Sequence, residues 1–176
     1  MQAQEILFAG FGGQGILSMG KFLAYAGMDA GLNVSWLPSY GPEMRGGTAN
    51  CSVILTGEAV GSPVVNEATT LVVMNRPSLD KFENAIKSNG LLIVDSDLVN
   101  RVPERKDLEV ISIPAQTIAE ELGSKTIANM VLLGALVART GIVSMEDLLK
   151  ALKDHGKAKF YEANKKALQK GAEYAA

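Results

Sequence analysis

The sequence predicts an α/β domain in which a mostly parallel sheet carries helices on both faces and is followed by a helical C-terminus. Three observations lead to this fold class. Short apolar runs typical of buried strands alternate with helix-like segments along the first 115 residues, a glycine-rich turn joins the first run to a helix, and the remaining residues have helical patterns. Because 176 residues is the size of one ordinary domain and no linker or repeat interrupts them, we expect a single domain over residues 1–176.

The first third of the chain predicts a strand, a buried helix and two further strands. The helix is apolar on nearly every face and ends at Gly31, since glycine readily takes the left-handed conformation that closes a helix. In the third strand Cys51 and Val53 alternate with Asn50 and Ser52, which predicts one more polar face. The predicted elements are strand 5–10, helix 14–31, strand 33–38 and strand 49–56.

The middle of the chain continues with a strand–helix–strand pattern. The strands are continuous apolar runs, as is typical of a parallel sheet that is buried on both faces. Leu79, Phe82 and Ile86 fall on one stripe of the intervening helix. The predicted elements are strand 69–75, helix 77–90, strand 90–97 and strand 108–115.

All residues from Ala115 onward are predicted to be helical. Ser144 followed by Asp147 is typical of a helix N-terminus. The single histidine, His155, precedes Gly156 and is expected to close that helix and to interact favourably with its dipole. The whole pattern predicts a Rossmann-like sheet closed by C-terminal helices, and ligands of such sheets bind at the carboxyl ends of the strands.

Composition excludes several classes of protein. The formal net charge of −2 gives no electrostatic surface for nucleic acid. The longest strongly apolar stretch, residues 130–138, is far shorter than the roughly 20 residues that span a membrane, and residues 1–8 lack a signal-peptide pattern, so we expect a cytoplasmic protein without membrane contact. The one cysteine, Cys51, excludes an internal disulfide and an all-cysteine metal site. With His155 assigned to a helix end, no nucleophile–histidine pair and hence no catalytic residue is predicted.

The segment GFGGQG follows the first strand directly and opens the first helix. Its spacing is that of dinucleotide-binding loops, in which backbone N–H groups at a helix N-terminus take a pyrophosphate. Such enzymes also carry Asp or Glu at the end of the second strand for the ribose hydroxyls, and the run VSWLPSY has neither. The loop therefore either binds an anion or only allows close packing of helix on strand. Its candidate ligand-binding residues are Gly10, Gly12, Gly13, Gln14 and Gly15.

A second glycine-rich loop, PSYGPEMRGG, leaves the second strand on the same side of the predicted sheet. It is longer than a simple turn requires. Arg45 offers a planar pair of donors that suits phosphate or carboxylate, although it could equally pair with Glu43 or contact another subunit. The candidate ligand-binding or active-site residues of this loop are Ser39, Tyr40, Gly41, Glu43, Arg45, Gly46 and Gly47.

Four segments in order, GFGGQG, SYGPEMRGGTANCSVIL, GSPVV and TIANMVLLGAL, together resemble the gamma subunit of the 2-oxoacid:ferredoxin oxidoreductases. The resemblance implies a multi-subunit enzyme that depends on thiamine diphosphate and iron–sulfur clusters. It would convert a 2-oxoacid and coenzyme A into acyl-CoA and CO2 and reduce ferredoxin. The middle segment is more similar to the 2-oxoglutarate and branched-chain branches than to the pyruvate branch, so 2-oxoglutarate is the favoured substrate.

The resemblance also implies a division of labour among subunits. Thiamine diphosphate and the clusters belong to the partner alpha, beta and delta subunits, which agrees with a chain that has one cysteine. This chain would shape the coenzyme A side of the active site and would be inactive alone. The rival interpretations are a stand-alone nucleotide-dependent oxidoreductase and a flavodoxin-like binding module.

Three further residues have two interpretations each. Trp36 is either an interface anchor, as is also expected of Tyr40, or a core residue. Cys51 is expected to be a core thiol rather than a reactive one. Asn129, on an otherwise apolar helix, is either a buried hydrogen-bonding residue or a contact near the loops.

Overall fold

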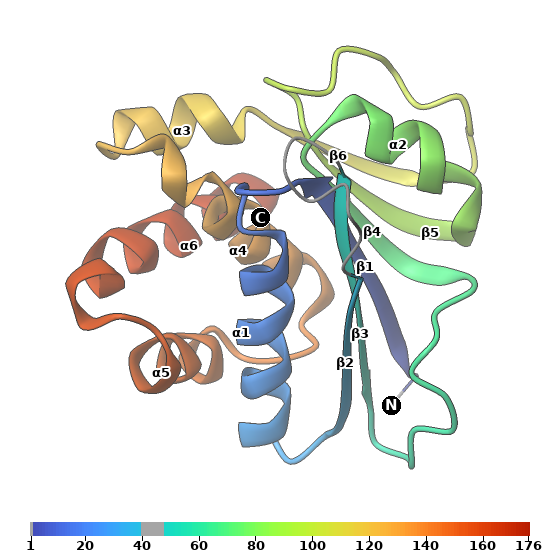
Figure 1. The fold of residues 1–176 in the computed structure, drawn as a ribbon, viewed down its shortest axis with the longest axis horizontal. Coiled ribbons are helices and arrows are strands. Elements are labelled where there is room, and N and C mark those ends of the chain that lie inside the picture. Colours follow the sequence, from blue (N-terminus) through green and yellow to red (C-terminus); the bar gives the residue numbers. More distant parts are fainter. Residues whose placement is uncertain (1, 40–47) are drawn as a thin grey trace.

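The computed structural model describes residues 2–39 and 48–176, and in these residues it contains one six-stranded sheet and six α-helices (Figure 1). The strands are β1 (Gln4–Phe11), β2 (Asn33–Ser39), β3 (Thr48–Thr56), β4 (Ala68–Val73), β5 (Ile86–Asp95) and β6 (Glu109–Ile113). The helices are α1 (Ile16–Asp29), α2 (Arg76–Phe82), α3 (Ala115–Glu121), α4 (Ala128–Thr140), α5 (Met145–His155) and α6 (Tyr161–Ala175).

The sheet is mixed, and its strand order is β2-β3-β1-β4-β5-β6. Strands β1, β4, β5 and β6 are parallel neighbours, whereas β3 is antiparallel to both β1 and β2. Five strands therefore point the same way, and only β3 runs against them. The carboxyl ends of those five strands and the start of β3 lie at one edge, so the predicted mostly parallel α/β fold is confirmed.

Helices cover both faces, but unequally (Figure 1). Helices α1 and α3–α6 lie on one face, over a large core that includes Phe8, Met19 and Val131. Helix α2 lies on the other face, over a smaller core that includes Leu71 and Leu79. Neighbouring residues of the central strands alternate between the two cores, which is why these strands are continuous apolar runs.

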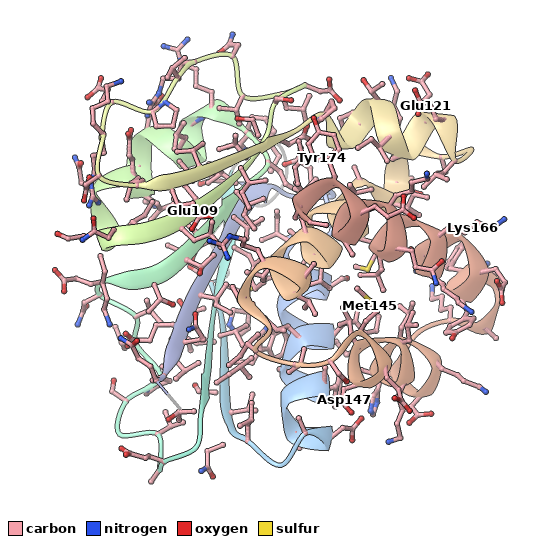
Figure 2. The ribbon with its side chains drawn as sticks, turned by 180° about the vertical axis from the view of Figure 1, so that it is seen from behind. Glu109, Glu121, Met145, Asp147, Lys166 and Tyr174 are labelled. Carbon is pink, nitrogen blue, oxygen red and sulfur yellow. The ribbon has the colours of Figure 1, made fainter. Side chains whose placement is uncertain are left out.

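Helices α5 and α6 form the outer layer of the larger core, over the buried helix α4 (Figure 2). Helix α5 begins as predicted, because the Ser144 hydroxyl accepts a hydrogen bond from the Asp147 N–H (2.9 Å). It ends at His155, whose ring stacks on Tyr25 of α1 with centroids 3.6 Å apart. His155 therefore serves packing at a helix end, as predicted. None of the helices in the described ranges is both long and apolar enough to cross a bilayer.

Helices α4 and α6 approach each other closely at two glycines. A Cβ atom built on Gly134 of α4 would overlap the Leu168 carbonyl of α6, and one built on Gly171 of α6 would overlap the Val131 carbonyl of α4. The two backbones are therefore in direct contact. Arg139 near the end of α4 also pairs with Glu109 at the start of β6 through contacts of 2.5 and 2.9 Å, which joins this helix pair to the edge of the sheet.

The predicted helix over residues 77–90 is wrong in its second half. Helix α2 ends at Phe82, a 3₁₀ turn (Glu83–Ala85) follows, and β5 begins at Ile86. Ile86 pairs with Ala68 in the sheet, and Asn89 takes a left-handed conformation (φ 61°) where the register shifts. The stripe of apolar residues persists because Ile86 enters the α2-side core from a strand. Hydrophobic spacing cannot distinguish a helical residue from a strand residue when both conformations would bury its side chain in the same core.

A charged cluster holds the segment between β5 and β6 against α2. Glu83, only 4% exposed, accepts hydrogen bonds from the Arg105 N–H (3.0 Å) and the Arg101 guanidinium (2.9 Å). Arg101 also pairs with Asp80 (2.6 Å). Burial alone would raise the pKa of Glu83, but the hydrogen bonds from Arg105 and Arg101 outweigh it, so the pKa is lowered.

We expect Glu83→Gln to lower the free energy of unfolding at pH 7 by about 2 kcal/mol, the size of a lost charge-assisted hydrogen bond. Because the folded state lowers the pKa of Glu83, its stabilisation is complete above the unfolded pKa of about 4.3 and is lost as the pH falls through the lower folded value. Urea unfolding from pH 7 to pH 3 should show the difference between the variant and the original protein shrinking as the pH falls.

The matched control is Glu120→Gln, because Glu120 pairs with Lys125 on the surface with both side chains more than half exposed. Such a pair contributes at most about 1 kcal/mol. Equal losses in the two variants, or a difference at Glu83 that does not depend on pH, would contradict the assigned role of the buried carboxylate.

Candidate functional site

The turn between β1 and α1 leaves the carboxyl edge of the sheet in a conformation that needs glycine. Gly13 (φ 89°) and Gly15 (φ 77°) both lie in the left-handed region, which side-chain-bearing residues adopt only with strain. Gly15 is also the N-cap of α1, and the described structure has neither a side-chain cap nor an acidic residue in the first turn of this helix. Among the described residues, neither a capping side chain nor an acidic residue of its own first turn therefore compensates the positive end of α1.

Two glycines of the motif are also required for packing. A Cβ atom on Gly10 would lie 2.6 Å from Oε1 of Gln14 and from Cδ1 of Ile16. A Cβ atom on Gly15 would overlap the side-chain amide of Asn129 in α4. Close packing thus accounts for Gly10 and Gly15, but it does not account for Gly13, where an added Cβ atom would have no atom of the described residues within 4 Å.

Gln14 fixes the turn to the neighbouring strand β4. Its Oε1 accepts a hydrogen bond from the Phe11 N–H (2.6 Å), and its Nε2 donates to the Met74 carbonyl (3.1 Å). Met74 in turn donates its N–H to the Ala9 carbonyl (3.0 Å). The glycine loop is therefore held at the ends of two adjacent parallel strands.

Two hollows flank this loop, each large enough for a phosphate or carboxylate group. The smaller, of about 190 Å³, is lined by Gly13, Gln14, Met74, Gln116, Lys125 and Thr126. The larger, of about 300 Å³, is lined by Phe11, Gly12, Gly13, Gly15, Ile16, Leu17, Ser18 and Ala49. The predicted site did not include Gln116, Lys125 or Thr126. Their only signal in the sequence was their place at the beginnings of helical segments, which a Rossmann-like sheet brings to its carboxyl edge.

Asp95, the last residue of β5, is fully buried and contacts Gln116, which lines the smaller hollow. It accepts hydrogen bonds from Nε2 of Gln116 (2.8 Å) and from the Asp97 N–H (3.1 Å). Burial raises the pKa of Asp95, and these hydrogen bonds only partly offset the effect. Its contacts orient Gln116, so Asp95 supports the wall of the hollow.

The second predicted loop leaves and re-enters the sheet beside the glycine loop. Ser39 is the last residue of β2 and pairs in register with Asn50, while Thr48, the first residue of β3, pairs with Phe11 at the end of β1. Both loops therefore depart from the same edge, as predicted. The other candidate residues, Tyr40, Gly41, Glu43, Arg45, Gly46 and Gly47, lie outside the described residues, and their roles stay predictions.

Cys51 is fully buried in the core beneath α1, and burial raises the pKa of its thiol to about 12. It is a core thiol, as predicted. Trp36 of β2 is 37% exposed and lies next to Gly20 of α1, so it belongs partly to the core and partly to the surface. Within residues 2–39 and 48–176, no three His, Cys, Asp or Glu side chains lie close enough together to hold a metal ion.

The glycine loop and the sheet that carries it recur in known proteins. Residues 5–174 match the family described as pyruvate ferredoxin/flavodoxin oxidoreductase. The ketoisovalerate oxidoreductase subunit VorA of Methanothermobacter marburgensis is 40% identical over 177 residues, which is 97% of this chain and 36% of VorA. The 2-oxoglutarate synthase subunit KorC of Methanocaldococcus jannaschii is 38% identical over 176 residues, which is 98% of this chain and 94% of KorC. The chain thus spans about a third of VorA and nearly all of KorC.

Solved structures share the fold at similar coverage. The gamma subunit of a keto/oxoacid ferredoxin oxidoreductase from Geobacter sulfurreducens superposes with a TM-score of 0.87 at 35% identity, covering 98% of each chain. A chain of the 2-oxoglutarate:ferredoxin oxidoreductase from Magnetococcus marinus, solved with 2-oxoglutarate, coenzyme A and succinyl-CoA bound, superposes with a TM-score of 0.89 at 27% identity, covering 99% of this chain and 31% of that one. With its sequence matched from residue 5 to residue 174, this chain belongs to the pyruvate ferredoxin/flavodoxin oxidoreductase family.

Proposed function

We propose that this chain is the gamma subunit of a 2-oxoacid:ferredoxin oxidoreductase that converts a 2-oxoacid and coenzyme A into acyl-CoA and CO2 and reduces ferredoxin. The observation that carries this proposal is the family match over residues 5–174, since it includes the glycine loop and all six strands. KorC, a relative of nearly the same length, is named as a subunit of a 2-oxoglutarate synthase.

The chain contributes the anion-binding side of the active site. The left-handed glycines Gly13 and Gly15 open the uncapped N-terminus of α1 toward the edge of the sheet, where backbone N–H groups and the helix dipole favour an anion. The phosphates of coenzyme A and the carboxylate of a 2-oxoacid are both suitable. Arg45, in the loop that joins β2 to β3, supplies the charged donor pair for the same phosphate or carboxylate group.

The redox cofactors belong to partner chains. There, thiamine diphosphate would supply the activation of the 2-oxoacid for loss of CO2, and iron–sulfur clusters would supply electron transfer to ferredoxin. A cysteine-ligated cluster needs several thiolates, whereas this chain has only the buried Cys51. The residues present do not fit a cluster. The single cysteine thus supports clusters held by the alpha, beta and delta partner subunits, and the family resemblance assigns thiamine diphosphate to these subunits as well. This chain positions coenzyme A beside them.

Of the possible 2-oxoacids, 2-oxoglutarate is our first choice. The name of KorC refers to 2-oxoglutarate, and that of VorA to ketoisovalerate, the branched-chain alternative. The contacts assigned to this chain are to the phosphates of coenzyme A or to the carboxylate that all 2-oxoacids have, so the partner subunits select the side chain of the substrate.

Co-expression with the candidate partner subunits tests the assignment. We expect a stable complex on size exclusion and ferredoxin reduction that requires both 2-oxoglutarate and coenzyme A, with no activity from this chain alone. Calorimetric titration of the isolated chain with NADH, NADPH and FAD is the control for the stand-alone interpretation. The proposal is wrong if the chain remains apart from its candidate partners, and micromolar nucleotide binding would favour the stand-alone enzyme instead.

A further inference from the structure

The glycine loop is held from a second direction, by the beginning of α4. Asn129 is the second residue of this helix and is 6% exposed. Its Nδ2 donates a hydrogen bond to the Gly15 carbonyl (3.2 Å), which lies 114 residues earlier in the chain. This contact joins the helical layer directly to the N-terminus of α1.

Asn129 is the one polar residue in the buried run from Ala128 to Val137. A buried amide is unfavourable unless it is hydrogen-bonded, and this amide is bonded at both ends. Besides the contact to Gly15, its Oδ1 accepts from the Met130 N–H (3.0 Å). A leucine of similar volume could fill this buried position equally well. The presence of an amide at residue 129 is therefore explained by its hydrogen bonds and not by packing alone.

The contact fixes the peptide group that begins α1. The Gly15 carbonyl also accepts the first hydrogen bond of the helix, from the Met19 N–H (3.1 Å). It therefore has two donors, which together determine its direction. The fit is close, since even one added Cβ atom on Gly15 would overlap the Asn129 amide. Because a carbonyl and the following N–H belong to one planar peptide, fixing the Gly15 carbonyl also fixes the Ile16 N–H.

Two amide side chains thus clamp the end of the loop that leads into α1, through the neighbouring residues Gln14 and Gly15. Gln14 ties it to β4, and Asn129 ties it to α4. The 3₁₀ turn that leads into α4 also contributes Lys125 and Thr126 to the smaller hollow beside Gly13. One corner of the structure therefore both holds the loop and forms the opposite wall of the hollow next to it.

We propose that Asn129 is a positioning residue that preorganises the glycine loop for its anionic ligand. The proposal rests on the function proposed above, in which the loop takes an anionic group of coenzyme A or of the 2-oxoacid. Ordering the loop before binding lowers the entropy that the ligand must overcome. Loss of the amide should therefore weaken ligand binding while leaving the chemical step, which the partner subunits perform, nearly unchanged.

Two variants remove the amide in different ways. Asn129→Leu roughly keeps the volume of the side chain. Asn129→Ala reduces that volume but introduces alanine, the residue with the highest helix propensity. The matched control is Ser144→Ala, which removes the hydrogen bond to the Asp147 N–H at the start of α5, at the far end of the helical layer from the loop. The control lowers stability through a lost helix cap without touching the glycine loop.

Hydrogen exchange on the full chain measures the clamp independently of activity. We expect faster exchange of the backbone amides in residues 12–17 in both Asn129 variants, and exchange there like that of the original protein in Ser144→Ala. Unchanged exchange in this segment in both Asn129 variants would overturn the proposal, since the amide would then not order the loop.

Kinetics of the assembled complex measure the consequence for binding. We expect both Asn129 variants to raise the KM for coenzyme A or for the 2-oxoacid about threefold to tenfold, the range of one lost hydrogen bond, with kcat changed less than about twofold. A purely structural Asn129 would lower thermal stability as Ser144→Ala does and leave both KM values unchanged, and that result would refute the proposal. If the original complex itself has no ferredoxin-reducing activity, the proposed function fails, whereas exchange in residues 12–17 still decides whether Asn129 orders the loop.

Discussion

Gly171→Ala is expected to lower the free energy of unfolding by about 3 kcal/mol, although alanine normally stabilises a helix relative to glycine by about 1 kcal/mol. The sign reverses because the added Cβ atom would overlap the Val131 carbonyl of α4. A carbonyl in a buried helix cannot turn aside as a flexible side chain can. Helices α4 and α6 must therefore move apart, which loosens the apolar contacts between them along their length.

Gly134→Ala tests the same contact from the other helix, since its Cβ atom would overlap the Leu168 carbonyl of α6. We expect a similar loss, and a double variant that loses less than the sum, because helices already separated by one methyl group accommodate the second more easily. Urea denaturation followed by circular dichroism measures all three variants.

The control is Gly61→Ala, in a loop where the added atom meets nothing within 4 Å and the backbone is not left-handed. Its effect should stay within about 0.5 kcal/mol. Losses below 1 kcal/mol at both helical glycines would show that the helices can separate freely, and the close backbone contact would then contribute little to stability.

Arg45→Ala in the assembled complex is expected to raise the KM for coenzyme A or for the 2-oxoacid about tenfold to a hundredfold. A lost charge-assisted hydrogen bond of roughly 1.5–3 kcal/mol has this effect. Arg45→Lys retains the charge but removes the planar pair of donors, so it separates the contribution of geometry from that of charge. If geometry matters, lysine should recover only part of the binding. Steady-state kinetics with each substrate varied in turn identifies which ligand the arginine contacts.

Glu43→Gln is the companion variant, because the alternative role of Arg45 is an ion pair with Glu43. In that case Glu43→Gln and Arg45→Ala should lower the melting temperature together and leave KM and kcat nearly unchanged. Such a result, with the complex intact on size exclusion, would remove Arg45 from the ligand site and assign its loop to the subunit interface.

The two glycine loops show how far the sequence predicts the site. The run EILFAG followed by GFGGQG identifies a strand, a turn and a helix, because apolar spacing and left-handed glycines are local properties of the chain. Parallel strands bring their carboxyl ends to one edge, so the departure of both loops from the same edge also follows from the predicted fold. The pairing of Thr48 with Phe11 does not follow from it, because it depends on the antiparallel strand β3 between β1 and β2. What the sequence leaves open is the opposite wall of the hollow, since Gln116 and Lys125 are ordinary polar residues in their local context.

Asn129 and Ile86 show what the sequence left open and the tertiary structure decided. From the sequence alone Asn129 was either a core residue or a contact near the loops, and the structure makes it both, because α4 packs with its N-terminus on Gly15. The sequence assigned Ile86 to a helix, but in the structure it begins β5 and pairs with Ala68 of β4. The apolar spacing did not reveal this, because the core under α2 accepts an apolar side chain from a helix or from a strand. Except at residues 83–89, the sequence by itself determined the succession of strands and helices along the chain, and it determined the glycine turn, since these depend on residue type and short-range spacing. Only the tertiary structure decided which distant residues meet at the loop, because such contacts arise from how whole elements pack, which no local pattern encodes.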